Sequence, residues 1–216
     1  MKVTAQKGYK HYATLITAVA GVMMAPMAWA DAAQMLTERL DPLQTYHADF
    51  EQLILDSAGE RLQEAQGEMW LARPGLLRWE VEAPYSQVVV STGDEVYMYD
   101  PDLEQVTVQA VDQRVTHTPA LLLSGSSSEL TENYEVFHNR EEGRDVFTLV
   151  PMGADTLFEE LTMFFDDDTL TRLLMTDSTG QRTAITFSDI DYNRHIDPER
   201  FIFEVPDGVD VIRDTY

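Results

Sequence analysis

The stretch "MWLARPGLLRWEVEAP", residues 69–84, decides the fold. Trp70 and Trp79 flank an Arg-Pro-Gly step that begins at Arg73. The segments before and after this step follow the two-residue alternation of β-strands, and Pro and Gly between them are turn residues. The stretch therefore predicts two neighbouring strands joined by a short turn that carries an arginine.

The same two-residue periodicity continues through most of the chain. Turn signals recur about every 8 to 12 residues, a spacing typical of antiparallel sandwiches and barrel-like sheets. We expect about ten strands in one domain, because the chain shows no linker, repeat or low-complexity tract. The strand-like segments are 45–55, 67–74, 76–84, 86–101 (two strands around a turn), 104–111, 133–139, 144–152, 158–166, 170–177, 181–192 and 197–212.

Helical patterns occur at only two places. Residues 31–42 place apolar side chains at helical spacing, with Asp31 as the expected cap and Pro42 at the end. Pro119, followed by Ala-Leu-Leu-Leu, predicts a short apolar helix between loops.

The first thirty residues have the features of a secretory signal peptide. A basic start precedes an apolar run that Pro26 ends, and Ala28-Trp29-Ala30 has the small-x-small form of a cleavage site. We expect cleavage after Ala30, so that residues 31–216 form a single exported domain. The alternative is an uncleaved anchor, although the run is short for a membrane span.

Composition narrows the possible functions. The chain has no cysteine, so disulfides, thiol chemistry and a lipid-accepting cysteine of its own are excluded. The first thirty residues hold three of the 15 basic residues and none of the 38 acidic ones, which leaves residues 31–216 with a net charge of −26. Such a chain is repelled by nucleic acids and anionic lipids. The acidic surface is either a solubility coat or an adaptation to a salty medium.

Several strands are apolar on both faces. Residues 88–90, 96–99 and 163–165 show this pattern, whereas a lone antiparallel sheet usually has one face in water. The helical segments could cover one face of a curled sheet. The enclosed space is then either a packed core or a cavity for an apolar ligand, and the pattern does not distinguish the two.

No catalytic constellation is present. The sequence lacks Gly-x-Ser-x-Gly, His-Glu-x-x-His and a phosphate-binding glycine loop. With so many carboxylates, a glycosidase-like pair carries no information. The Asp166–Asp168 run lacks the glycine and distal glutamate of a calcium loop, so we interpret it as a solvated turn. We expect no enzyme activity, no metal and no cofactor; the histidines His47, His117, His138 and His195 show no ligand spacing.

Arg73 allows two interpretations. A guanidinium carries five donors in a rigid fork, so beside an apolar cavity it could bind the unsatisfied backbone carbonyls at the end of a covering helix. Arg73 would then act as a latch, and Pro74 would fix the local backbone. The alternative is a surface arginine that pairs weakly with one of many carboxylates.

Six segments in this order resemble the LolA family of periplasmic carriers of outer-membrane lipoproteins. They are "DAAQMLTERL", "YHADFEQ", "GEMWLARPGLLRWE", "YMYDPDLEQVTV", "TPALLLSGSS" and "FIFEVPDGVDV". The W-x-x-R-P-x-x-x-x-W piece is the most specific of them. The resemblance covers nearly all of residues 31–216.

The resemblance implies an incomplete antiparallel β-barrel, closed by a helical lid over an apolar cavity that takes lipoprotein acyl chains. Cargo would come from a LolCDE-type ABC transporter in the inner membrane and pass to a LolB-type receptor in the outer membrane. The protein would be a monomer. The residues implied are Arg73 and Pro74 as the latch, Leu40, Leu123 and Ser124 as its backbone partners, and Trp70, Trp79, Phe50, Val90, Met98, Leu121 and Leu122 along the cavity.

One position departs from the family pattern. Two residues before the second tryptophan the family often has an aromatic side chain that contacts a partner, and here that position is Leu77, followed by Arg78. Contact with the inner-membrane complex could therefore be tuned differently.

Three other functions remain as alternatives. The chain could carry or sense another amphiphilic lipid with the same fold, it could be an exported enzyme that uses carboxylates, or it could be an interaction domain with a filled core. A fluorescent probe for apolar cavities separates the carriers from the filled domain.

Overall fold

One twisted sheet of twelve strands dominates the computed structural model, which describes residues 27–111, 119–153 and 158–213. The strands are β1 (Thr45–Leu55), β2 (Arg61–Ala72), β3 (Leu76–Ala83), β4 (Gln87–Thr92), β5 (Glu95–Asp100), β6 (Gln105–Ala110), β7 (Tyr134–Glu141), β8 (Arg144–Pro151), β9 (Phe158–Asp166), β10 (Thr169–Asp177), β11 (Arg182–Tyr192) and β12 (Asp210–Arg213). The helices are α1 (Met27–Leu40), α2 (Ser127–Asn133) and the 3₁₀ helices η1 (Pro119–Ser124) and η2 (Pro198–Phe201).

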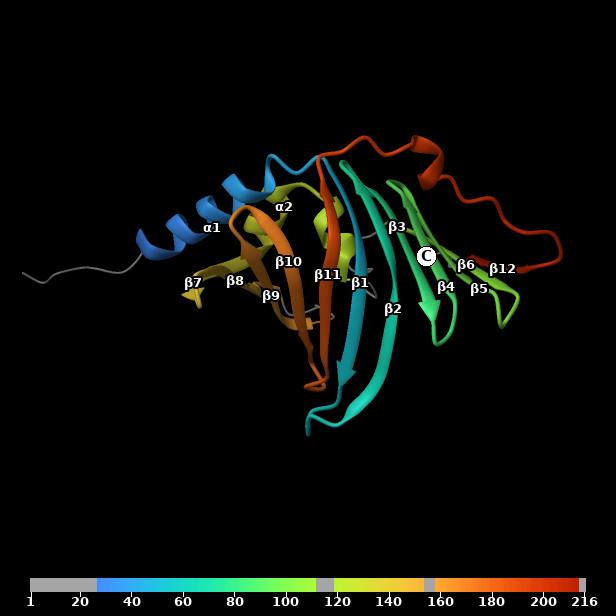
Figure 1. Ribbon diagram of the computed structural model, residues 1–216, viewed down its shortest axis with the longest axis horizontal. Helices are drawn as coiled ribbons and strands as arrows, with labels where there is room; N and C mark the ends of the chain where they lie inside the picture. The colour runs from blue at the N-terminus through green and yellow to red at the C-terminus, as the bar shows by residue number, and fades with distance from the viewer. Residues whose placement is uncertain (1–26, 112–118, 154–157, 214–216) are drawn as a thin grey trace, which may run out of the picture.

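The strand order is β12-β6-β5-β4-β3-β2-β1-β11-β10-β9-β8-β7. Neighbouring strands are antiparallel except at one edge, where β12 pairs with β6 in parallel. The order closes on neither edge, so within the described residues the sheet curls without becoming a full barrel (Figure 1). The expected fold class, an incomplete antiparallel β-barrel with few helices, is confirmed.

The concave face of the sheet carries the main core. Residues directly opposite each other on paired strands share a face, and Ala48, Met69, Trp79 and Val89 form one such row across β1 to β4. All four are buried in the same apolar cluster. The same cluster includes Val96 of β5 and Val136 of β7, so the core follows the curl of the sheet from β5 round to β7.

Helices cover this concave face (Figure 1). Leu36 and Leu40 of α1, Leu123 of η1 and Leu130 of α2 are all at most 4% exposed and belong to the apolar cluster of the sheet. We call α1, η1 and α2 the lid. Since their apolar side chains lie within the core, the lid is closed in this structure.

The convex face has a smaller covering of its own. Val90, Val106 and Val108 are almost fully buried but lie outside the main cluster. The chain after β11 crosses this side of the molecule on its way to β12, as the red trace in Figure 1 shows. Phe203 of this segment packs against Tyr97 and Tyr99 of β5.

Most elements predicted from the sequence are confirmed, with three differences. The helix begins at Met27 rather than at Asp31, because the alanine-rich residues before Asp31 extend it. Phe201 and Phe203 were expected in a strand, but Pro198–Phe201 is a 3₁₀ helix and only Asp210–Arg213 is extended and paired. The described residues form twelve strands rather than about ten. In the part of the chain described, no helix has the length and apolar character needed to cross a bilayer.

Candidate functional site

The turn between β2 and β3 places Arg73 beside the lid. β2 ends at Ala72 and β3 begins at Leu76, and the Arg73–Pro74 peptide is cis. The Arg73 amide donates to the carbonyl of Gln44, which fixes the turn against the start of β1. Gly75 has a φ of +77°, and a Cβ there would lie 2.9 Å from Cα of Gly93, so the turn requires glycine.

The Arg73 guanidinium joins two parts of the lid. Nε donates to the carbonyl oxygen of Leu123 and Nη1 to that of Leu40, both at 2.8 Å. Leu40 is the last residue of α1, and Leu123 lies near the end of η1, where carbonyls lack partners within the helix. The Ser124 carbonyl, expected to accept from Arg73, instead accepts from the backbone amide of Gly75 at 2.8 Å.

Burial shapes the electrostatics of this arginine. Partial burial of Arg73 lowers the pKa of its guanidinium, while the charges of Asp41 and Tyr192 act in the opposite direction. Nη2 is buried and has no hydrogen-bond partner within the described residues. Arg73 is therefore directed at backbone carbonyls rather than at a carboxylate, which is the arrangement that the latch interpretation requires.

A second arginine fixes the same helix from the other side. Arg39 of α1 pairs with Asp145 of β8 and with Asp168 in the β9–β10 turn, where it also donates to the carbonyl of Asp167. His138 of β7 lies 2.9 Å from the other Asp145 oxygen. This network could not be predicted from the sequence, because any arginine in so acidic a chain has many possible partners.

The residues that were expected to line the cavity form two groups: five lie on the concave side of the sheet and two on the convex face. Phe50 and Trp79 stack at a ring-centroid distance of 3.6 Å within the core. The half-buried side chains of Met98, Leu121 and Leu122 pack against the same core. All five lie on the concave side, where Leu121 and Leu122 are part of the lid and the other three belong to the sheet.

Three residues do not lie where the sequence placed them. Trp70 and Val90 belong to the convex face: Trp70 stacks on His47 and under Arg200, while Val90 lies opposite Arg78. They were predicted to line the cavity, and that prediction is wrong because strand alternation turns them away from Met69 and Val89. Leu77 was predicted to contact a partner, but it is 0% exposed in the core, so that prediction is wrong for this structure.

An open hollow of about 830 Å³ lies elsewhere on the sheet. Strands β1, β2, β10 and β11 and residues 83–85 line it, and the lid contributes nothing. Its lining includes Glu51, Glu64 and Arg172, so it lacks the apolar walls that acyl chains need. On the concave side, in contrast, lid side chains occupy the apolar space.

The remaining expected sites are placed as follows. Asp166 ends β9, and Asp167 and Asp168 form the turn that receives Arg39. His138 lies in the Arg39 network, His195 is exposed, and His117 lies outside the described residues. His47 lies on the convex face beside Glu68.

The architecture defines the class of open-barrel proteins whose concave apolar face is covered by helices. The family model described as "Outer membrane lipoprotein carrier protein LolA" matches residues 41–204. The chain belongs to this LolA family.

Relatives named outer-membrane lipoprotein carrier protein match almost end to end. The one from Chromohalobacter salexigens is 55% identical over 203 residues, covering 94% of this chain and 97% of that protein. The one from Azotobacter vinelandii is 48% identical over 200 residues, covering 93% and 97%.

Solved structures agree on the fold. A LolA superfamily protein from Nitrosomonas europaea superposes with a TM-score of 0.50 at 13% identity, covering 80% of this chain and 98% of that one. This likeness concerns the fold alone.

Proposed function

We propose that this chain is a periplasmic carrier that binds the acyl chains of outer-membrane lipoproteins under its lid and releases them at the outer membrane. The single observation that carries the proposal is the contact of Arg73 with the carbonyls of Leu40 and Leu123. It fixes the end of α1 and η1 over an apolar face through hydrogen bonds that can be broken and remade. The names of the relatives point to the same cargo.

Release sets a limit on how tightly the carrier binds. Burying acyl chains gains about 0.8 kcal/mol per methylene, so full enclosure of three chains would prevent release. In this account, part of that gain is spent on displacing Leu36, Leu40 and Leu123 from the core and on breaking the Arg73 hydrogen bonds. Each hydrogen bond to a charged group is worth about 1.5 to 3 kcal/mol. Breaking them therefore lowers the apparent affinity about tenfold or more.

The carrier's route follows from its sequence and charge. Residues 1–30 would direct export and be removed, leaving residues 31–216 in the periplasm. The acidic surface would keep the shuttle from adhering to anionic membranes. A LolCDE-type ABC transporter would supply the cargo and a LolB-type receptor would accept it, with the carrier acting as a monomer and without catalysis.

The experiment is native mass spectrometry of residues 31–216 purified from the periplasm, with Arg73→Leu alongside. Co-purified triacylated lipoprotein, enriched in the variant, supports both the carrier and the latch. Equal cargo in both proteins keeps the carrier and contradicts the latch. Protein that stays empty even after incubation with a triacylated peptide contradicts the proposal, and retention of another lipid would favour a carrier of a different amphiphile.

A further inference from the structure

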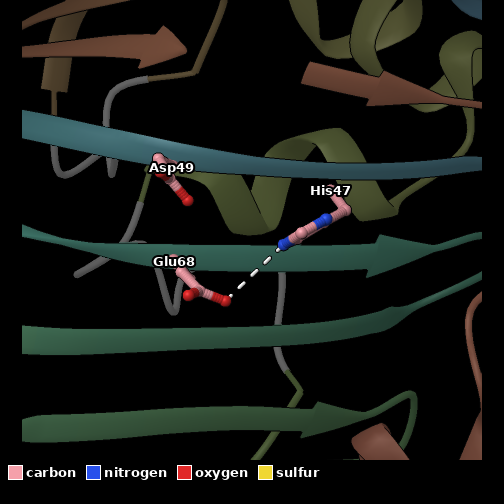
Figure 2. Close-up of side chains that lie close together, drawn as sticks. All are labelled: His47, Asp49 and Glu68. Carbon is pink, nitrogen blue, oxygen red and sulfur yellow. Dashed lines mark ion pairs between the residues drawn. The ribbon is translucent and has the colours of Figure 1, made fainter. Parts of the chain in front are cut away.

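The convex face contains a polar cluster that the carrier function does not use. His47 and Asp49 lie two residues apart on β1, and Glu68 lies directly opposite Asp49 on β2. Figure 2 shows the three side chains on one side of the two strands, with His47 directed at Glu68. One ligand atom from each lies within 4.8 Å of the other two. The cluster is on the face opposite the lid.

The Nε2 nitrogen of the His47 imidazole has no evident role in the fold. This Nε2 atom is buried from solvent and has no hydrogen-bond partner among the residues that the structure describes. Such orphaned polar atoms are rare in folded proteins and call for a ligand or an ion. The nearest Glu68 oxygen lies 3.6 Å from Nε2, which is too far for a hydrogen bond. This distance is close to the separation between two ligand atoms that both bind a tetrahedral zinc ion at about 2.1 Å.

The surroundings of His47 orient it as a ligand. Asp191, its cross-strand neighbour on β11, places a carboxylate oxygen 3.7 Å from Nδ1. The Asp191 carboxylate lies on the Nδ1 side of the ring, so Nε2 is the nitrogen that faces Glu68. The ring is also stacked on Trp70 at a centroid distance of 5.1 Å and an angle of 9°, which holds its plane.

We propose that His47, Asp49 and Glu68 form a binding site for a divalent transition-metal ion of the zinc type. One imidazole nitrogen and two carboxylates are the donor set that such ions favour, whereas Ca²⁺ and Mg²⁺ prefer oxygen alone. The two carboxylates balance the charge of the ion. The guanidinium of Arg200 lies over the ring of Trp70. The site would link β1 to β2 and leave open positions for water.

The test is calorimetric titration of residues 31–216 with ZnCl₂ in high salt and excess Mg²⁺, which suppress unspecific binding to the acidic surface. We expect one saturable Zn²⁺ site, from which Ca²⁺ displaces Zn²⁺ only poorly. His47→Gln and Glu68→Gln are expected to weaken it at least about tenfold, and His195→Gln, which removes an exposed histidine outside the cluster, to leave it unchanged.

A second readout guards against loss of folding. Co²⁺ bound to the parent should give visible absorption bands, and metal at His47 should change the fluorescence of the stacked Trp70. Glu68→Gln keeps the His47–Trp70 stack, so a folded Glu68→Gln protein with parental metal affinity would overturn the proposal. Absence of saturable Zn²⁺ binding in the folded parent would overturn it as well.

Discussion

The Nη1 atom of Arg73 donates a hydrogen bond of 2.8 Å to the carbonyl oxygen of Leu40, the last residue of α1. Arg73 lies on the β2–β3 turn, so this contact links the lid to the rim of the sheet. The Leu40 carbonyl, which lies at the helix end, also accepts from the backbone amide of Leu43, and Arg73 adds a charged donor to it. The bond from Arg73 is broken whenever α1 moves away.

Removing the guanidinium should loosen the lid. In Arg73→Leu the carbonyls of Leu40 and Leu123 lose the hydrogen bonds from the guanidinium, so amide hydrogens in α1 and η1 should exchange faster, by a factor of about ten. Hydrogen exchange followed by mass spectrometry measures this. Strands β9 and β10, which lie away from the turn, are the internal control. Unchanged exchange in α1 and η1 would mean that core packing alone holds the lid.

The pH dependence of the Arg39 network has a defined sign. The hydrogen bond from His138, supported by the charge of Arg39, lowers the pKa of Asp145 in the folded state. A depressed carboxyl pKa stabilises the folded protein above the unfolded pKa of about 3.9, and this contribution is lost as the pH falls through the lower folded pKa. The parent should therefore exceed Asp145→Asn in unfolding free energy at neutral pH, with the difference vanishing in acid. Denaturant titrations across the pH range measure it, and a constant difference would contradict the assignment.

Gly67 of β2 lies against the backbone of β3 with no room for a side chain. A Cβ at this position would lie 1.8 Å from the carbonyl oxygen of Glu80 and 3.0 Å from the Phe50 ring. Gly67→Ala should destabilise the protein by about 3 kcal/mol or more, because backbone must shift. Gly153→Ala is the matched control, since its Cβ would meet nothing within 4 Å. Equal melting temperatures for the two variants would contradict this packing.

The charge of residues 31–216 predicts a salt effect on stability. Self-repulsion of a net charge of −26 opposes folding, and salt screens it. The melting temperature should rise as NaCl is increased from low to high concentration. A scan with an uncharged osmolyte of equal osmolarity controls for water activity. A melting temperature independent of salt would show that the acidic surface is only a solubility coat.

The two-residue periodicity of the sequence predicted most strands of the sheet, because apolar and polar side chains alternate along a half-buried strand. It could not assign Trp70 to a face, since its neighbours Met69 and Leu71 are apolar as well, whereas Trp79 lies between the charged residues Arg78 and Glu80. Nine positions separate them, and only the β2–β3 register shows that Trp79 shares a face with Met69 while Trp70 shares one with Arg78.

Contacts between residues far apart in the chain could not be predicted from the sequence, for a different reason. The Arg39–Asp145 pair joins residues far apart in the chain, and the sequence offers 38 acidic residues as partners. The segment after β11 has no periodicity that distinguishes a covering strap from a strand. For Arg73, guanidinium chemistry left a latch and a weak surface ion pair as alternatives, and only the resemblance to a known family indicated which backbone carbonyls it would contact.

If the Arg73 hydrogen bonds make cargo binding reversible, their loss should block transfer of cargo to the receptor. The measurement loads the parent, Arg73→Leu and Arg61→Leu with a labelled triacylated lipoprotein and follows its passage to a LolB-type receptor. Arg61 is an exposed arginine whose pairing with Glu64 is remote from the lid, so it controls for loss of charge. We expect all three proteins to bind the lipoprotein. The parent and Arg61→Leu should transfer it to the receptor, and Arg73→Leu should retain most of it. Transfer from Arg73→Leu at the parental rate would contradict the account.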